Sequence, residues 1–268
     1  MGVHPTAVVA DGAALGADVE IGPYCVVGQK VVLGPSCRLH SHVVVEGDTH
    51  LGEGCQIYPH AVLGTTPQDK KLKDGSSVSK LRIGSHNEIR EFSTLHGGTE
   101  FGGGTTTVGS HNMLLVGCHI GHDAVVGDNV IFTNGAMAAG HTVVEDNAIL
   151  GAMVGVHQFA RVGRYSMVGA GSMLSKDAPP FSLVQGDRAR LVSINVVGLR
   201  RAGFSSAQIG NVKRAYRALF WKPGTMGERL SSVRDLAEKD DLVQCIVKFA
   251  ENSPRGLVMP RDRSSSME

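Results

Sequence analysis

The sequence predicts an all-β solenoid, a left-handed parallel β-helix of hexapeptide repeats, with a small C-terminal α-helical domain. Aliphatic residues return at every sixth position, the position four residues later is small, and glycine supplies 35 of the 268 residues while aromatic residues are scarce. This period is typical of parallel β-helices, in which each hexad forms one short strand and a turn. We therefore expect a β-helix over residues 1–195 and a helical domain over residues 196–268.

The aliphatic series defines the coils. It runs unbroken from Val3 to Leu63, resumes from Ile83 to Leu95, and continues from Val108 to Leu174. One coil cannot bury its own apolar face, so these side chains should stack as ladders that fill the prism. The small position takes in four of the five cysteines, which we expect to fill the core rather than to react or form disulfides. These four are Cys25, Cys37, Cys55 and Cys118.

Residues 65–80 and 97–107 interrupt the repeat. A solenoid accommodates such insertions as loops on its surface. The first loop carries the sequence Gln68-Asp69-Lys70-Lys71, and the second is rich in glycine and threonine. A polar, glycine-rich loop of the second kind is as often without a function as with one.

The hexads end near Asp177, and apolar residues then recur at helical spacing. We expect Ser205 or Ser206 to cap the first long helix and Pro223-Gly224 to end it. Apolar faces are expected at residues 209–220, 226–236 and 242–249, and a loose tail at residues 261–268.

Charge and hydropathy argue against several function classes. Lys and Arg total 26 against 25 Asp and Glu, so nothing predicts a nucleic acid partner or attachment to an anionic membrane. No uncharged apolar run approaches membrane-spanning length, and the N-terminal residues lack the features of a secretory signal. We therefore expect a cytoplasmic protein with no stable membrane insertion.

Three of the twelve histidines are predicted to lie on one edge of the prism. His122, His141 and His157 follow aliphatic positions that are one coil of eighteen residues apart, and His119 precedes the first of them. Neutral imidazoles from neighbouring coils are suited to bind Zn²⁺, whereas one imidazole beside a carboxylate is suited to deprotonate a hydroxyl group. Asp123 directly follows His122, which favours the base and leaves the metal site open.

Four segments carry a resemblance to a known enzyme family: GCHIGHDAVVGDNVIFTNGAMAAGH, GAMVGVHQF, INVVGLRRAGF and SPRGL. In pattern and order they resemble the UDP-N-acetylglucosamine O-acyltransferases, hexapeptide-repeat enzymes of the first step of lipid A biosynthesis. The resemblance covers nearly the whole chain. It implies a homotrimer that transfers a 3-hydroxyacyl chain from acyl carrier protein to the 3-hydroxyl of UDP-N-acetylglucosamine, without a metal or other cofactor.

The resemblance also implies roles for individual residues. His122, in the H-I-x-H-D motif, would be the general base, Asp123 would orient it, and the Gly140 N–H would be the oxyanion donor. Ala170 would stand at the hydrocarbon ruler, where the family often has glycine, and its methyl group would favour a somewhat shorter acyl chain. Substrate binding would fall to Gln68, Asp69 and Lys71 of the Q-D-x-K loop, and to His119, His141, His157, Gln158, Asn195 and Arg201.

Three positions depart from the family pattern. Val197 stands where an acidic residue is common, Ala202 where a second arginine is common, and Gly97 removes a basic residue from the second loop. These departures affect the expected contacts with the nucleotide and acyl carrier protein, so an N-acyltransferase acting on an amino-sugar nucleotide stays an alternative.

Two other classes fit less well. A zinc enzyme similar to the γ-class carbonic anhydrases would have a histidine pair at wider spacing than His119 and His122. A non-catalytic structural β-helix would make the Q-D-x-K, H-I-x-H-D and V-H-Q-F motifs coincidental.

Overall fold

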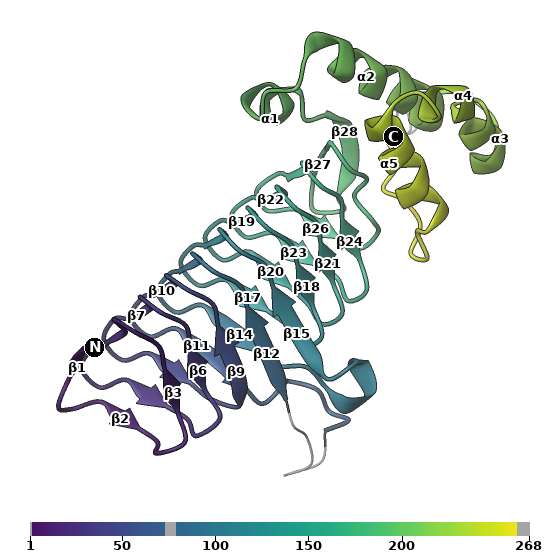
Figure 1. Ribbon diagram of the computed structural model, residues 1–268. Helices are drawn as coiled ribbons and strands as arrows, with labels where there is room; N and C mark the ends of the chain where they lie inside the picture. The colour runs from purple at the N-terminus through teal and green to yellow at the C-terminus, as the bar shows by residue number, and fades with distance from the viewer. Residues whose placement is uncertain (1, 73–78, 262–268) are drawn as a thin grey trace.

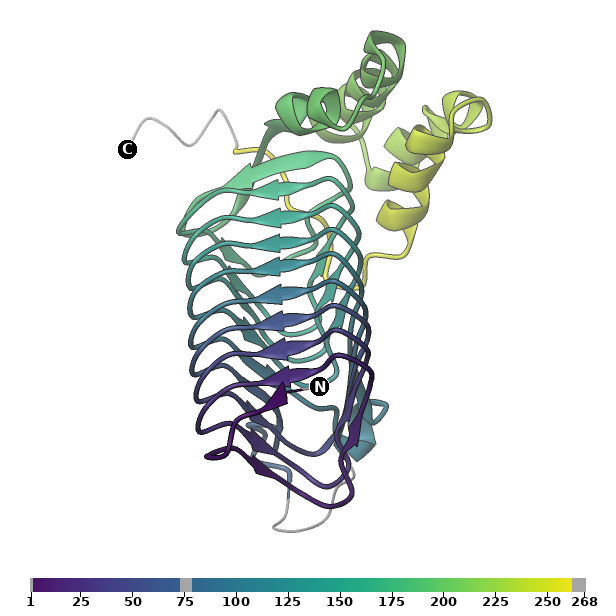
Figure 2. The same cartoon turned by 60° about the vertical axis from the view of Figure 1, so that its left-hand side comes forward.

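The computed structural model describes residues 2–72 and 79–261. Its larger part is a left-handed parallel β-helix with one sheet on each of three faces (Figure 1). Each face receives every third strand of the regular coils, and these strands pair in parallel with the strand one coil away. Figure 2 shows the coils stacked from the N-terminus to the helices at the opposite end. The predicted fold class is confirmed.

The described strands form three sheets, of eleven, nine and eight strands. The eleven-stranded sheet contains β1 (Gly2–Val3), β4 (Glu20–Ile21), β7 (Arg38–Leu39), β10 (Gln56–Ile57), β13 (Glu88–Ile89), β16 (Met113–Leu114), β19 (Ile131–Phe132), β22 (Ile149–Leu150), β25 (Met167–Val168), β27 (Ser182–Gln185) and β28 (Arg190–Ile194). The nine-stranded sheet contains β2 (Val8–Val9), β5 (Val26–Val27), β8 (Val44–Val45), β11 (Val62–Thr65), β14 (Thr94–His96), β17 (His119–Ile120), β20 (Met137–Ala138), β23 (Gly155–Val156) and β26 (Met173–Leu174). The eight-stranded sheet contains β3 (Ala14–Leu15), β6 (Val32–Leu33), β9 (Asp48–Leu51), β12 (Lys80–Ile83), β15 (Thr105–Val108), β18 (Val125–Val126), β21 (Val143–Val144) and β24 (Arg161–Val162).

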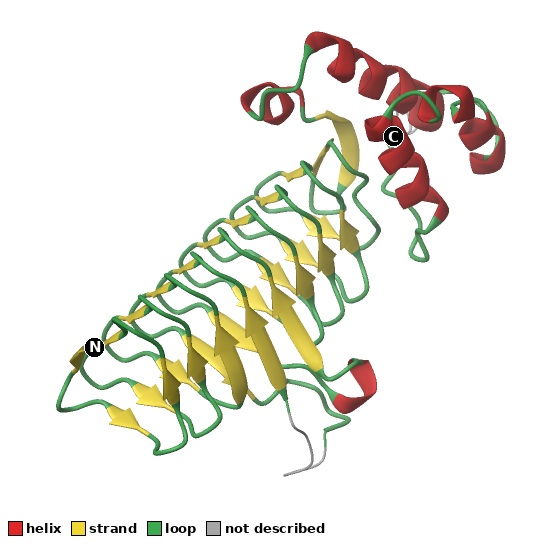
Figure 3. Cartoon of the chain, viewed as in Figure 1, coloured by secondary structure: helices red, strands yellow, loops and turns green. Residues whose placement is uncertain are grey.

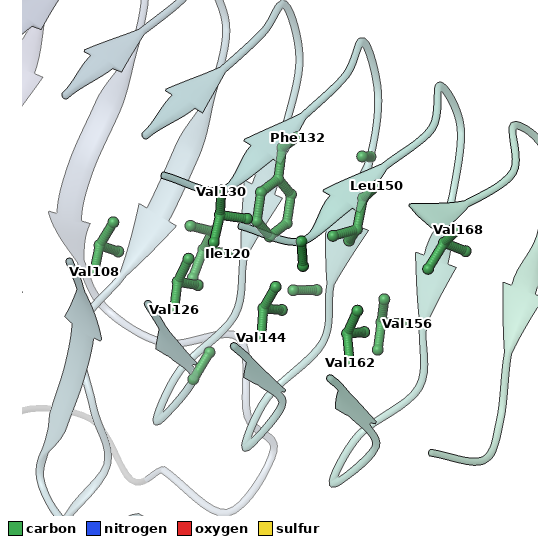
Figure 4. Close-up of a cluster of buried hydrophobic side chains, with 14 of the residues drawn as sticks. Val108, Ile120, Val126, Val130, Phe132, Val144, Leu150, Val156, Val162 and Val168 are labelled. Carbon is green, nitrogen blue, oxygen red and sulfur yellow. The ribbon is translucent and has the colours of Figure 1, made fainter. Parts of the chain in front are cut away.

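The aliphatic ladders fill the prism. Ile120, Phe132 and Leu150 are fully buried, and Figure 4 shows side chains from neighbouring strands pointing into the interior. The four cysteines of the small position are also buried and free, and burial raises the pKa of Cys118 to about 11. Val3 differs from the other ladder residues because it is 43% exposed. It belongs to the first described coil, so no described coil covers it on that side.

The two insertions are shorter than the sequence suggested. Thr65 ends β11 and Lys80 begins β12, so the first insertion spans residues 66–79, of which residues 73–78 lie outside the described part. In the second, residues 105–107 belong to β15, where they continue the ladder with residues 80–82 of β12. Strands β12 and β15 pair over four residues each, whereas the hexad pattern predicts strands of about two residues. The short 3₁₀ helix η1 (Glu100–Gly102) lies beside the prism in Figure 3.

The C-terminal helices follow β28. They are α1 (Val196–Arg201), α2 (Ser206–Trp221), α3 (Met226–Ser231), α4 (Arg234–Ala237) and α5 (Asp241–Glu251). Ser205 caps α2 in a capping box with Gln208. The sequence offered Ser205 or Ser206 as this cap, and the structure selects Ser205. The single stretch expected around residues 226–236 is divided into α3 and α4. Ser232, at the break, donates its hydroxyl to the Arg229 carbonyl, a local bond that competes with helix continuation.

The helices pack back onto the β-helix. The buried Tyr216 hydroxyl of α2 donates to the Pro180 carbonyl, and Asp177 accepts from the Ser253 hydroxyl at 2.7 Å. Leu257 then forms a parallel bridge with Asp177. Of the tail predicted over residues 261–268, residues 262–268 lie outside the described part. Within the described part, every helix is too short or too polar to cross a membrane.

Candidate active site

His122 and Asp123 form a buried pair at the corner that follows β17. His122 Nδ1 lies 2.8 Å from Asp123 Oδ2, and the two side chains are 6% and 1% exposed. Asp123 has a φ of 58°, a left-handed conformation that aspartate adopts more readily than most residues. Because a carboxylate only accepts hydrogen bonds, the proton resides on His122 Nδ1 and the lone pair on Nε2 is free to act as a base.

The second insertion and the strand after it, β15, hold Asp123 through one threonine each. The Thr99 N–H donates to Asp123 Oδ1 at 2.9 Å, and the Thr99 hydroxyl donates to Oδ2 at 2.6 Å. The Asp123 N–H in turn donates to the Thr106 hydroxyl at 2.8 Å. Sequence reasoning assigned no role to these threonines, because both contacts join residues at least 17 positions apart. The sequence feature that pointed to Thr99 was its place in a polar insertion that leaves the solenoid one coil before the histidine–aspartate pair.

His141 comes from the next coil and faces the pair. Its ring is 5.0 Å from that of His122 in an edge-to-face arrangement, and its Nε2 is 3.8 Å from Asp123 Oδ2. On its other side it stacks on Phe159, with ring centroids 4.5 Å apart. Burial lowers the pKa of His141, against the opposing effect of Asp123, so the ring is neutral near pH 7.

Gly140 brings a backbone N–H to the same place. A β-carbon on Gly140 would lie 2.6 Å from His122 Nε2, so the free nitrogen of the imidazole abuts this residue. Gly140 is buried, and among the described residues its N–H has no hydrogen-bond acceptor. An N–H that the fold leaves without an acceptor, beside a base, is suited to bind a ligand oxygen.

The first insertion also reaches the pair. Asp69 Oδ2 lies 3.8 Å from His122 Nε2, and Asp69 Oδ1 accepts from the Lys71 N–H at 2.8 Å. The Lys71 ammonium is 5.6 Å from the ring centroid of Phe101, which belongs to the second insertion. Gln68 is exposed beside them. Two of the three predicted loop residues therefore lie at the site, and both insertions contact each other over it.

His119 lies on the strand that precedes the pair. Its Nδ1 is 2.8 Å from the Thr94 hydroxyl, and its ring is 5.0 Å from that of His96, edge to face. Burial lowers the pKa of both rings, that of His96 to about 4. His96 was not among the predicted site residues, although it directly precedes the second insertion. It is 5% exposed, and its Nδ1 has no partner among the described residues.

The remaining predicted residues lie outside this cluster. His157 and Gln158 are exposed one coil further on, and Ala170 is exposed at the corner that follows β25, on a different edge of the prism. Asn195 and Arg201 lie several coils away, at the start and end of α1. The Asn195 side chain caps α1 by accepting from the Gly198 N–H and donates to the Tyr165 carbonyl. One chain alone therefore does not bring all the predicted substrate contacts together.

A metal site is a weaker fit to these residues. Within the described part of the chain, the donor atoms of His122, Asp123 and His141 lie within 4.8 Å of one another, and His157 is not in this group. The nitrogen of His122 that faces Asp123 is engaged in a hydrogen bond of 2.8 Å. Zinc with three histidine ligands needs three free imidazole nitrogens at about 2.0–2.1 Å from the ion. The arrangement instead matches a base oriented by a carboxylate.

Comparisons with known proteins identify the family of the chain. A family profile described as UDP-N-acetylglucosamine O-acyltransferase, domain 2, matches residues 177–258. Acyl-(acyl-carrier-protein)–UDP-N-acetylglucosamine O-acyltransferases from Paraburkholderia phymatum and Aliivibrio fischeri are 48% and 49% identical, over 96% of this chain and 98% and 97% of theirs. The solved UDP-N-acetylglucosamine acyltransferase of Francisella novicida superposes with a TM-score of 0.95 at 35% identity, over 98% of this chain and 96% of that one. The chain therefore belongs to the UDP-N-acetylglucosamine O-acyltransferase family.

Proposed function

We propose that this protein transfers a 3-hydroxyacyl chain from acyl carrier protein to the 3-hydroxyl of UDP-N-acetylglucosamine, a step of lipid A biosynthesis. The observation that carries the proposal is the buried His122–Asp123 pair with its free Nε2 beside the unpaired Gly140 N–H. Relatives of nearly full length that are named for this activity support the choice of substrates.

The proposed reaction uses no group beyond the chain and its two substrates. His122 Nε2 takes the proton of the sugar hydroxyl as its oxygen attacks the thioester carbonyl. Asp123 stabilises the resulting imidazolium, and the Gly140 N–H donates to the oxyanion of the tetrahedral intermediate. Collapse of the intermediate breaks the carbon–sulfur bond, and the imidazolium returns its proton to the departing thiolate. The products are the ester and the free thiol of acyl carrier protein.

Substrate binding is proposed for the residues that surround this pair. Contacts with the sugar and phosphate are proposed for Asp69, which lies 3.8 Å from His122 Nε2, and for Lys71, whose ammonium lies 5.6 Å from the Phe101 ring of the second insertion. His119 and His141 would contact the substrates as neutral rings. The same role is proposed for Gln68, His157 and Gln158, and nucleotide contacts are proposed for Asn195 and Arg201.

A homotrimer would complete the site. Large apolar side chains remain exposed on the outer faces near it, among them Val125 at 44%, Met137 at 43% and Met173 at 49%. Exposed apolar groups on flat faces favour association with further copies of the chain. Sedimentation would test this, since a trimer has three times the chain mass of 28.2 kDa. A cytoplasmic location and the division at residue 195 stay predictions from the sequence.

Ala170 is proposed to limit the acyl chain. It is exposed at a corner of the solenoid, so its methyl group is available to occupy space that a glycine would leave open. Turnover measured across acyl lengths should then favour chains somewhat shorter than those used by an Ala170→Gly variant. A clear preference of the unaltered protein for the longest chains would contradict this role.

The decisive experiment measures acyl transfer from 3-hydroxyacyl carrier protein to UDP-N-acetylglucosamine and, in parallel, to its 3-amino analogue. His122→Ala is the test variant, and metal content is determined in the same preparation. Ester formation that is lost in the variant supports the proposed base chemistry. Amide formation alone would identify the amino-sugar nucleotide as the acceptor, and stoichiometric zinc without transfer would favour a metal enzyme.

A further inference from the structure

Both hydrogen-bond donors of Thr99 bind the same side chain. It is fully buried, and its N–H and hydroxyl both donate to the Asp123 carboxylate, one to each oxygen, at 2.9 and 2.6 Å. Together with His122 Nδ1, this gives the carboxylate three donors, two of them on Oδ2. Hydrogen bonds to a charged, buried acceptor are shorter and stronger than neutral ones, so they fix the orientation of the carboxylate.

The insertion that carries Thr99 also covers the pair. A β-carbon on Gly102 would lie 2.1 Å from Asp123 Oδ2 and 2.6 Å from His141 Cε1, so the chain of η1 lies directly on both side chains. The strand that follows the insertion, β15, supplies Thr106, which accepts from the Asp123 N–H. The side chain and the backbone of Asp123 are therefore both held by the segment from Thr99 to Thr106.

The direction in which Asp123 points decides which nitrogen of His122 is free. A carboxylate held against Nδ1 keeps the proton there and leaves the Nε2 lone pair beside Asp69 and Gly140. If the carboxylate could rotate, the imidazole would populate other orientations and tautomers, and fewer molecules would present a competent base.

We propose that Thr99 is a positioning residue for the acyl transfer, acting through Asp123 on His122. The inference rests on the proposed function and extends it to the second insertion, whose threonine no spacing rule of the repeat singles out. Thr99 does not touch the reacting atoms; its effect passes through the Asp123 carboxylate.

The test compares Thr99→Val, Thr99→Ser and Thr107→Val. Valine has the shape of threonine but no hydroxyl, serine restores the hydroxyl, and Thr107 is an exposed neighbour on β15 that serves as the control. Thr99→Val should lower kcat roughly 10- to 100-fold, the range expected for one hydrogen bond to a buried charge, with KM for both substrates nearly unchanged. Thr99→Ser should recover most of this loss, and Thr107→Val should resemble the unaltered protein.

A double-mutant cycle shows whether the effect passes through Asp123. In an Asp123→Asn background, Thr99→Val should cause little further loss, because the charge that the hydroxyl orients is gone. Equal losses in both backgrounds, or a raised KM with unchanged kcat, would overturn the inference.

A measurement without turnover separates this inference from the proposed function. In protein labelled with ¹⁵N at histidine, with His122→Ala to assign the signals, the His122 ring should be the Nδ1–H tautomer and should become a mixture in Thr99→Val. An unaltered tautomer in the variant refutes the role of Thr99, even if the acyl transfer itself is not observed. No transfer by the unaltered protein, with the tautomer shift present, refutes only the proposed substrates.

Discussion

Two corners of the same prism carry side chains at the same position of the hexad, yet only one of them forms a candidate active site. The corner after the eleven-stranded sheet presents the exposed stack Tyr24, His42, His60 and Phe92, with neighbouring rings about 5 Å apart. The corner after the nine-stranded sheet presents Asp123, His141 and Phe159. All seven residues have φ between 55° and 70°.

The difference lies in what covers each corner. Phe92 is 60% exposed, whereas Asp123 is 7% exposed beneath the two insertions. The repeat supplies a corner that stacks side chains in register, and the insertions convert one stretch of one corner into a low-dielectric site where a histidine–aspartate pair has strong electrostatic effects. The stacking of histidines and aromatic rings alone therefore does not mark a site in this fold.

The largest expected effect comes from removing the charge of Asp123. Asp123→Asn should lower kcat about 10²- to 10⁴-fold, because the amide neither stabilises the imidazolium nor enforces the Nδ1–H tautomer. Asp18→Asn is the matched control, since Asp18 is an exposed aspartate with a similar φ of 55° at a corner without insertions. Comparable losses in the two variants would mean that the covered corner is not special.

The covered corner should also make stability depend on pH through His96. Burial holds its pKa at about 4 in the folded state, below the unfolded value of about 6.5, so the unfolded chain binds the proton first. Neutral His96 therefore contributes fully to the free energy of unfolding above about pH 6.5. This contribution, about 3 kcal/mol, is lost as the pH falls to about 4.

Chemical unfolding between pH 7.5 and pH 4 would measure this dependence. His96→Gln should flatten the fall in the free energy of unfolding, whereas His111→Gln, at an exposed corner, should not. Equal slopes for the two variants would refute a buried, neutral His96.

A smaller effect on catalysis is expected from Gly140→Ala. The variant keeps the backbone N–H but places a methyl group 2.6 Å from His122 Nε2, which the imidazole must move to accommodate. We expect a loss in kcat of about tenfold, as for other displacements of a catalytic group. Gly28→Ala, after β5 of the same sheet, is the control because its nearest contact would be 3.4 Å. Full activity of Gly140→Ala would show that Nε2 does not face this backbone.

The smallest effect is predicted at the exposed corner. Phe92 stacks on His60 with centroids 5.1 Å apart, but most of its surface is already in water. Phe92→Ala should lower the free energy of unfolding by less than about 1 kcal/mol, whereas Phe132→Ala, inside the prism, should cost about 3–5 kcal/mol. Thermal unfolding of the two variants measures the contrast, and a loss at Phe92 that equals that at Phe132 would mean that the corner stack holds the coils together.

The sequence by itself determined the coils and the phase of the histidines. A hexad period admits one register, so Ile120, Ala138 and Val156 had to align, and the structure pairs them one above the other. That alignment placed His122 and His141 on one edge, and the adjacency of Asp123 indicated the base.

Only the tertiary structure decided which corner is covered and what covers it. The contacts of Thr99 and Gly102 with Asp123 join an irregular loop to a later coil, and no periodicity constrains where a loop returns. The tertiary structure also decided the exposure of Val3 and the division of α3 from α4. A repeat specifies nearest-neighbour stacking, whereas insertions and ends depend on contacts that the repeat does not encode.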